Sequence, residues 1–320
     1  MTTIPFISDD FVAQNCNFPT LIEALRKGFS NSEIEVPMRH HHDFPNPQEN
    51  IDSTLLLMPA FHPGKDLGVK IVTVSPNNGE HNLPAIQGVY IYLDAQKGNI
   101  KAILEAKALT ASRTAATSAL ASSYLSRTDS STLLMIGTGA LASNLVKAHA
   151  SVRPITKVYV WGRNSEKSKA VCDELKDFPF SCQAVESIES VIHKADIISC
   201  ATLSKMPLVF GKWLQEGQHL DLVGAYKKDM READDEAISK SSVFIDTYQG
   251  GLKESGDIVI PLQNNIIAKE DIKADLFELC SNTKQGRTSA KEITYFKSVG
   301  HALEDLVAAS HFYQEFITTK

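Results

Sequence analysis

The stretch from Thr132 to Asn164 constrains the fold of this chain more than any other. It opens with a short apolar run, TLLMI, which is typical of a strand buried on both faces of a sheet. Gly137, Gly139 and Ala142 follow at the spacing G-x-G-x-x-A, and a helical pattern leads to a second apolar run, KVYVW. Small residues at these places allow a tight turn, the approach of a pyrophosphate and close packing of the helix on the sheet. This order predicts a strand-helix-strand unit that binds a dinucleotide at the helix N-terminus.

The end of the second predicted strand bears on which dinucleotide binds. Sites that prefer NAD usually carry Asp or Glu there, where the carboxylate binds the ribose 2′-hydroxyl. Residues 157–164 contain no acid, and Arg163 and Asn164 follow Gly162 instead. Because a guanidinium can pair with a 2′-phosphate, we expect NADPH to be preferred, with NADH as the alternative cofactor. The competing interpretation is that Arg163 is an ordinary solvated arginine and that both cofactors are used.

Alternation of apolar runs and helical patterns continues after Thr132. Candidate strands occupy residues 132–136, 157–161, 182–185, 196–201, 219–223 and 243–247. This alternation predicts an α/β fold with a Rossmann-type, doubly wound parallel sheet. The first 118 residues differ, because their β-rich segments are separated by turns and few helices, so they predict a second, mostly antiparallel α+β domain. The glycine-containing segment 250–261, GGLKESGDIVIP, is expected to be a loop.

Composition limits the partners and the compartment. A length of 320 residues favours about two domains. A net charge of −6 argues against nucleic-acid or anionic-membrane partners. No apolar run approaches the roughly 20 residues of a membrane span, and the first ten residues lack the features of a signal peptide. The cysteines are scattered and form no CxxC pair, so we expect a reduced, cytoplasmic protein without a zinc site or a disulfide framework.

Three cationic residues outside the nucleotide-binding region stand in apolar or small-residue surroundings: Arg39, Lys70 and Arg113. Singly, each favours a structural ion pair, because an unpaired buried charge is costly. Together they suit a clamp for a small carboxylate, since arginine offers bidentate hydrogen bonds. The run His40, His41 and His42 does not predict a metal site, because neighbours in a strand point to opposite faces. Glu105 and Asp305 are expected to be structural, with Asp305 orienting the ring of His301.

Several segments, in order and over nearly the whole chain, resemble the ornithine cyclodeaminase/mu-crystallin family. They are VPMRHHH, LMPAF, GVKIV, LTASRTAATSALAS, GTGALA, VGAYKKDMRE and FKSVGHALEDLVAAS. The family contains ornithine cyclodeaminases, alanine dehydrogenases, cyclic ketimine reductases and mu-crystallin. The resemblance implies a homodimer joined through the non-nucleotide domain. We therefore expect residues 1–118 with 301–320 to form a substrate-binding and dimerisation domain, and residues 119–300 to form the dinucleotide-binding domain.

The resemblance also implies roles for single residues. Arg39, Lys70 and Arg113 would bind the substrate carboxylate, with Lys70 near the reacting carbon and nitrogen. His301 would face the site, which makes Lys70 and His301 the candidate catalytic residues. The expected cofactor contacts are Thr114, Gly137, Gly139, Ala140, Leu141, Arg163, Asn164 and Gly300.

Two departures from the cyclodeaminase pattern point to a reductase. Cyclodeaminases resemble one another in carrying an acid where this chain has Leu57, and an aspartate where it has Tyr226. Neither residue can bind and activate the distal amino group of ornithine, whereas Tyr226 suits a flat ring. We therefore expect reduction of a small cyclic ketimine carboxylate. Δ1-Pyrroline-2-carboxylate would give L-proline, and Δ1-piperideine-2-carboxylate would give L-pipecolate. The alternatives are an alanine dehydrogenase, an ornithine cyclodeaminase and a mu-crystallin-like binding protein.

Overall fold

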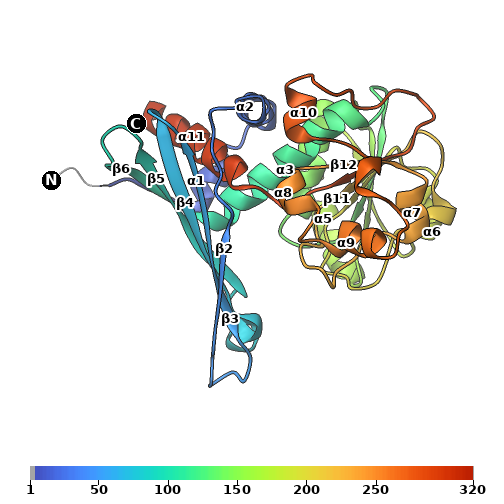
Figure 1. Ribbon diagram of the computed structural model, residues 1–320. Helices are drawn as coiled ribbons and strands as arrows, with labels where there is room; N and C mark the ends of the chain where they lie inside the picture. The colour runs from blue at the N-terminus through green and yellow to red at the C-terminus, as the bar shows by residue number, and fades with distance from the viewer. Residues whose placement is uncertain (1–3, 320) are drawn as a thin grey trace. The chain divides into compact units, whose positions relative to one another are not determined.

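The computed structural model describes residues 4–319, so the first three residues of the segment examined for a signal peptide lie outside the described part. The chain divides into two compact units (Figure 1). The first unit comprises the described parts of Met1–Arg113 and Ala302–Lys320, and the second comprises Thr114–His301. The chain passes from the first unit to the second inside helix α3, Ala106–Leu125.

In the described part of the first unit, six strands form one sheet in the order β1-β6-β5-β4-β3-β2. Neighbouring strands are antiparallel except β1 and β6, which are parallel. This arrangement confirms the predicted mostly antiparallel sheet. The strands are β1 (Phe6–Ile7), β2 (His40–Phe44), β3 (Ser53–His62), β4 (Asp66–Val74), β5 (Ile86–Asp94) and β6 (Ile100–Glu105).

The two faces of this sheet have different environments. Helix α11 (Ala302–Thr318) packs on β3, β4 and β5, and it also contacts α2 (Phe18–Phe29). Because side chains alternate along a strand, the cross-strand row Met58, Lys70 and Tyr90 is buried on one face. The adjacent row, Leu57, Ile71 and Val89, lies on the opposite face and is half-buried. The other short helices of this unit are α1 (Asp9–Gln14) and η1 (Pro76–His81).

Helix α2 illustrates how local sequence and packing agree. The apolar residues of the segment FPTLIEALRKGF recur at helical spacing, which predicts a helix over Phe18–Phe29, and α2 has this range. Asn17 caps it by accepting a hydrogen bond from the Thr20 N–H. Leu21 and Leu25 are fully buried, as expected for an amphipathic helix. A Cβ at Gly28 would lie 2.6 Å from Cγ2 of Val307. The glycine therefore lets α2 and α11 approach closely.

The described part of the second unit holds an eight-stranded sheet in the order β13-β12-β14-β11-β10-β7-β8-β9. Its neighbouring strands are all parallel, which confirms the predicted doubly wound fold. The predicted strands are β7 (Thr132–Ile136), β8 (Lys157–Trp161), β9 (Ser181–Val185), β10 (Ile197–Cys200), β11 (His219–Leu222) and β12 (Ser242–Ile245). Two strands were not predicted, β13 (Ile272–Asp275) and β14 (Thr294–Lys297). Both include charged residues, so neither gives the continuous apolar run of a buried parallel strand.

The prediction of a loop over residues 250–261 is wrong. The structure has α8 (Tyr248–Gly251) and α9 (Gly256–Gln263) there, capped by Thr247 and Ser255. Glycines that looked like turn signals are instead needed for packing, since a Cβ at Gly256 would lie 2.3 Å from the Met230 carbonyl oxygen. The remaining helices are α4 (Ala142–Val152), α5 (Ser165–Glu174), α6 (Glu189–Ile192), α7 (Asp235–Ser239), α10 (Leu276–Cys280), η2 (Gly211–Trp213) and η3 (Lys269–Asp271). Within residues 4–319, no helix combines the length and apolar character that a membrane span requires.

Candidate active site

A buried ionic cluster in the first unit brings together residues that are far apart in the sequence. Lys70 on β4 places its Nζ 2.9 and 2.8 Å from the two carboxylate oxygens of Asp305 on α11. Arg113 on α3 donates from Nε to Asp305 at 2.9 Å and from Nη1 to Glu304 at 2.6 Å. Both acids are fully buried, and Lys70 and Arg113 are only 3% and 5% exposed. The structure thus joins two of the three predicted clamp residues through a shared carboxylate.

The register of β2 on β3 indicates that Arg39 lies near this cluster. His40 pairs with Leu57 across β2 and β3, so the preceding residue, Arg39, continues toward Met58 and Lys70 on the same face. The positive charge of Arg39 also contributes to lowering the pKa of Lys70. Lys70 and Arg113 thus share two buried carboxylates, and Arg39 adds a third positive charge nearby.

The environment of Lys70 changes its protonation. Burial lowers its pKa to about 8, because desolvation disfavours the ammonium, while the charge of Asp305 opposes that shift. Burial alone would raise the pKa of Asp305, but the charges of Arg113 and Lys70 hold it below its usual range. Lys70 is therefore a cation at neutral pH, and it can release its proton when the pH rises slightly above neutral.

Two acids singled out in the sequence, Glu105 and Asp305, hold parts of the fold together. Glu105 accepts a hydrogen bond of 2.6 Å from the backbone N–H of Asp9 at the start of α1. Asp305 binds Lys70 and Arg113, and its expected role in orienting the ring of His301 stays a prediction. Glu304, the second acid of the cluster, was missed. The signal was the adjacent pair Glu304-Asp305 in a helix that is otherwise apolar on its buried side.

The nucleotide loop of the second unit has the shape that a pyrophosphate needs. Gly137 has φ +117°, and a Cβ there would lie 2.5 Å from the Ala201 carbonyl oxygen, so glycine is required. A Cβ at Gly139 would meet nothing within 4 Å, which leaves the backbone open to a ligand. Helix α4 begins at Ala142 without a side-chain cap, so its first N–H groups are available to phosphate oxygens. These residues fit a dinucleotide.

A hollow of about 370 Å³ opens beside this loop. It is lined by residues of the loop, α4 and α5: Thr138, Gly139, Ala140, Ser143, Asn144, Lys167, Ala170, Val171 and Glu174. Leu141 directly precedes α4. The loop therefore borders open space on the side that Gly139 leaves uncovered.

Arg163 and Asn164, which follow β8, differ in their surroundings. Asn164 caps α5, because its Oδ1 accepts hydrogen bonds from the N–H groups of Glu166 and Lys167 at 3.0 and 3.2 Å. Arg163 is exposed and directly precedes this cap. A role for either residue in binding the cofactor stays a prediction, and the cap explains why Asn164 suits this position.

Buried acids hold the loops at the carboxyl ends of the parallel strands, the edge where α/β sheets bind ligands. Glu232 accepts from the N–H of Thr202 after β10 at 2.7 Å, and from the N–H groups of Gly224 and Ala225 after β11 at 2.8 and 3.1 Å. Lys297 lies 3.7 Å from Glu232. Sequence reasoning missed this network, although Glu232 stands in the VGAYKKDMRE segment.

A second buried acid holds the segment after β14. Asp246 Oδ2 accepts from the N–H groups of Val299 and Gly300 at 2.7 and 2.8 Å. Gly300 has φ +81°, which favours glycine. His301 follows, 8% exposed, with its ring edge-on to Phe277 at 5.8 Å between centroids. Asp246 thus anchors the backbone at Gly300, whose contact with the nicotinamide stays a prediction.

Thr114 and Tyr226 are two further predicted site residues of the second unit. Thr114 is buried on α3, and Tyr226 is half-buried after β11, with the Lys227 ammonium 5.8 Å from its ring centroid. The roles of Thr114, Tyr226 and His301 toward a ligand stay predictions.

Leu57 does not lie where a residue that contacts the substrate beside Lys70 would lie. Leu57 pairs with His40 and Ile71, and it lies on the half-buried face of the sheet, whereas Lys70 lies on the buried face. A strand points successive side chains to opposite sides. Within this unit Leu57 therefore does not border the ionic cluster, and the contrast with cyclodeaminases depends on Tyr226.

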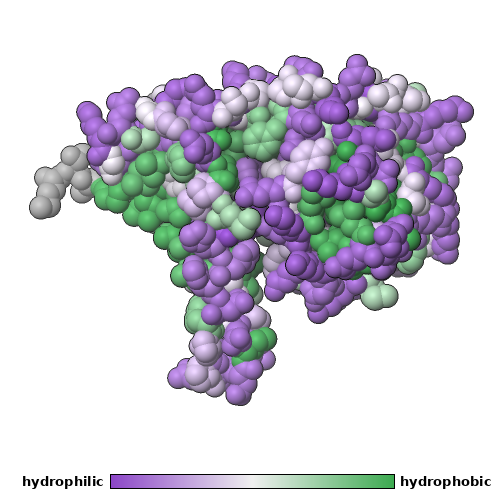
Figure 2. Space-filling view, viewed as in Figure 1, coloured by the Kyte–Doolittle hydropathy of each residue, from purple (hydrophilic) through white to green (hydrophobic). Residues whose placement is uncertain are grey.

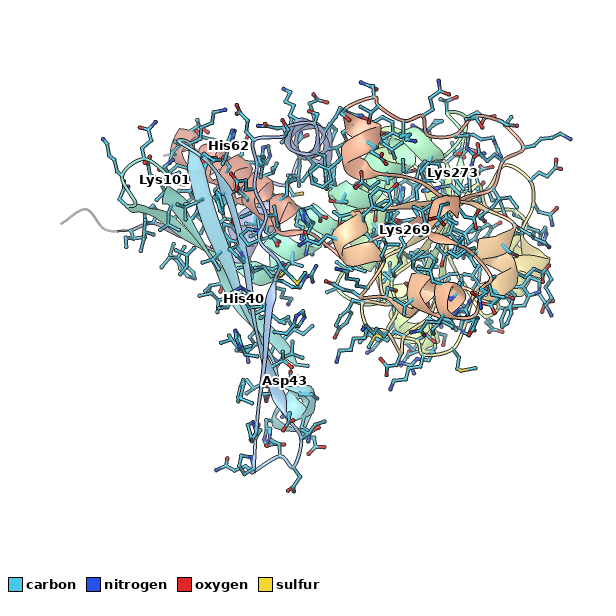
Figure 3. The ribbon with its side chains drawn as sticks, viewed as in Figure 1. His40, Asp43, His62, Lys101, Lys269 and Lys273 are labelled. Carbon is cyan, nitrogen blue, oxygen red and sulfur yellow. The ribbon has the colours of Figure 1, made fainter. Side chains whose placement is uncertain are left out.

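The three consecutive histidines are exposed along β2, the strand on which Figure 3 labels His40 and Asp43. The rings of His40 and His42 meet edge-on at 5.9 Å, while His41 points to the other side of the strand. Among residues 4–319 no group of three or more His, Cys, Asp or Glu side chains is arranged to hold a metal ion.

A parallel sheet with a glycine loop that suits a pyrophosphate defines a nucleotide-dependent enzyme of the Rossmann class. Residues 8–320 match the ornithine cyclodeaminase/mu-crystallin family, and the chain belongs to that family.

Similar proteins agree with this assignment. An uncharacterised protein of Schizosaccharomyces pombe is 42% identical, over 97% of this chain and 96% of its own length. The Δ1-pyrroline-2-carboxylate reductase of Colwellia psychrerythraea is 39% identical, over 95% of this chain and 96% of its own. The solved structure of the Thermococcus litoralis Δ1-pyrroline-2-carboxylate reductase with NADH and L-proline has a TM-score of 0.91 at 32% identity, covering 99% of this chain and 98% of that one.

Proposed function

We propose that this protein reduces a small cyclic ketimine carboxylate, with Δ1-pyrroline-2-carboxylate as the first substrate to test and L-proline as its product. The chain is an NAD(P)H-dependent oxidoreductase that acts on C=N bonds, as its family and its reductase relatives indicate. The observation that carries the substrate class is the buried cluster of Lys70 and Arg113 with Asp305 and Glu304, with Arg39 as a third cation nearby.

Each residue of the cluster would have a distinct task. Arg113 uses Nε and Nη1 to bind the two acids, which fixes the plane of its guanidinium. Together with Arg39, it would hold the substrate carboxylate in one orientation. Lys70 would point its ammonium at the imine nitrogen, and a proton there makes the imine carbon electrophilic. Asp305 keeps Lys70 in place and protonated at neutral pH.

The glycine loop and the N-terminus of α4 would hold the dinucleotide, which would supply the hydride for the imine carbon. The chain's own contribution is to fix the phosphates and to hold the strand-end loops through Glu232 and Asp246. Tyr226 would offer a flat wall to the ring. It is a poor base at neutral pH, so it would not activate the distal amine of ornithine.

A substrate comparison tests this function. We expect NAD(P)H oxidation with the five- and six-membered ketimine carboxylates to exceed oxidation with pyruvate plus ammonia by at least about a hundredfold in kcat/KM, about 2.7 kcal/mol. Incubation with ornithine and NAD⁺ should release no ammonia above background. Ammonia release comparable to imine reduction would identify a cyclodeaminase, and preferred turnover of pyruvate plus ammonia would identify an alanine dehydrogenase. The absence of turnover with both ketimines, with pyruvate plus ammonia and with ornithine would favour a binding protein.

The cofactor preference rests on Arg163. We expect NADPH to have an equal or lower KM than NADH, and Arg163→Ala to raise the KM for NADPH by roughly tenfold while leaving that for NADH unchanged, because only NADPH carries the 2′-phosphate. Lys169→Ala is the matched control, since Lys169 is an exposed cation of α5 paired with Glu166 at 2.8 Å. An unchanged KM for NADPH in Arg163→Ala would show that Arg163 does not bind the phosphate.

The first unit would also form a homodimer. Its sheet has an apolar, half-buried face that the unit's own helices do not bury, and Figure 2 shows hydrophobic residues over its strands. Members of this face are Leu57, Pro59, Phe61, Leu67, Val69, Ile71, Val89, Ile91, Leu93 and Ile103. A contiguous apolar patch of this kind usually marks an interface between proteins. We propose that a second copy of the chain covers it.

We expect wild-type protein to sediment as a dimer and Ile71→Asp to sediment as a monomer, because the substitution places a charge on the apolar face. Analytical ultracentrifugation gives both masses. Ile317→Asp introduces the same charge at a side chain that is 47% exposed on α11, and it should leave the dimer intact. A monomeric wild type, or a dimer that both substitutions leave intact, would contradict this interface.

A further inference from the structure

Two cysteines that look unrelated in the sequence meet in the second unit. Cys172 lies near the end of α5, and Cys182 lies on the edge strand β9, which packs against α5. The Cys182 thiol donates a hydrogen bond to the Cys172 sulfur at 2.8 Å. Both residues are partly exposed, so small solutes can reach them. Neither belongs to the ionic cluster or to the nucleotide loop.

We propose that Cys172 and Cys182 form a modification site at which a hydroperoxide produces a reversible disulfide between α5 and β9. All five cysteines, each within the described residues, are thiols in the structure. Cys200 and Cys280 are buried, and burial raises the pKa of Cys200, which keeps its reactive thiolate scarce. Cys172 and Cys182 are therefore accessible to solutes, and their two sulfurs are in contact.

The hydrogen bond gives the two sulfurs different chemistry. It lowers the pKa of Cys172, because the donated proton stabilises the Cys172 thiolate, and it raises the pKa of the donor, Cys182. The thiolate is the nucleophilic form of cysteine. Cys172 is thus the sulfur that reacts first, and Cys182 is the resolving thiol.

Oxidation of the two thiols to a disulfide takes two steps. The Cys172 thiolate attacks one oxygen of hydrogen peroxide, the O–O bond breaks, and the products are the Cys172 sulfenic acid and hydroxide, which takes up the thiol proton as water. The sulfur of Cys182 then attacks the Cys172 sulfur, the S–O bond breaks, and a second water leaves with the Cys182 proton. The two sulfurs together lose two electrons to the peroxide. A dithiol reverses the bond by thiol–disulfide exchange.

Peptide mapping tests the proposal directly. Lys169, Lys176 and Lys194 place the two cysteines on separate tryptic peptides, residues 170–176 and 177–194. The full-length protein is treated with hydrogen peroxide, alkylated without reduction, digested and analysed by mass spectrometry. We expect these two peptides to appear joined, with complete loss of the joined species after treatment with dithiothreitol.

Three serine variants discriminate the mechanism. Cys172→Ser should abolish the joined species, and Cys182→Ser should leave a Cys172 sulfenic acid that dimedone traps. Cys16→Ser is the matched control, since Cys16 is also partly exposed, and it should change nothing. The proposal is overturned if the joined peptides do not form at any peroxide concentration that leaves the protein folded. It is also overturned if Cys172 links instead to Cys16.

Discussion

Replacing Arg113 by alanine should lower kcat/KM for the ketimine by on the order of 2–4 kcal/mol, roughly 30- to 900-fold, with cofactor affinity retained. Arg113 belongs to the first unit, whereas the glycine loop belongs to the second. Steady-state kinetics and titration of NADPH fluorescence measure the two effects separately. A variant that loses cofactor binding but keeps its KM for the imine would place Arg113 on the cofactor.

The alanine substitution also leaves Glu304 and Asp305 buried without their guanidinium partner, which should destabilise the fold by about 3–5 kcal/mol. Arg113→Lys separates catalysis from stability. Lysine keeps the charge but cannot bind two acids and a substrate carboxylate through one planar group. We expect this variant to regain most of the thermal stability and to remain at least about tenfold impaired in kcat/KM. Arg26→Ala, at a partly exposed arginine paired with Glu23 on α2, should match wild type.

The second large effect concerns Lys70 and pH. If protonated Lys70 is required, kcat/KM should be constant below pH 8 and should fall tenfold per pH unit above it, because burial lowers its pKa to about 8 and the ammonium is lost as the pH rises. Lys70→Met should remove nearly all activity at every pH, since it removes both the proton and one positive charge of the cluster.

Lys70→Arg provides the control for that profile. Arginine keeps the charge and does not titrate in this range, so any residual activity should no longer fall near pH 8. The ionisation of the imine itself can be followed separately by its absorbance. If Lys70→Arg keeps the wild-type fall near pH 8, another group carries that proton and the assignment to Lys70 is wrong.

Local patterns were sufficient for most of the fold. Continuous apolar runs identified β7 and β8, and the helical spacing of Phe18–Phe29 identified α2. The patterns failed where a buried strand contains charge, as in β14 with Lys297, because that charge is paired with Asp257 at 3.0 Å by a contact between distant segments. They failed again at α9, where glycines permit close packing of a helix and do not mark a loop.

The sequence by itself determined the family, the dinucleotide loop and the identity of the candidate cations, since these depend on residue type and short spacing. Only the tertiary structure decided which partners these cations have. Lys70 and Asp305 are 235 residues apart in the chain, and their contact forms when α11 packs on β4. Strand register decided that Leu57 faces away from Lys70, and the packing of α5 on β9 brought Cys172 to Cys182. The physical reason is that a local pattern does not encode the distances between elements. Ion pairs, contacts between thiols and the face of the sheet on which a side chain lies all depend on those distances.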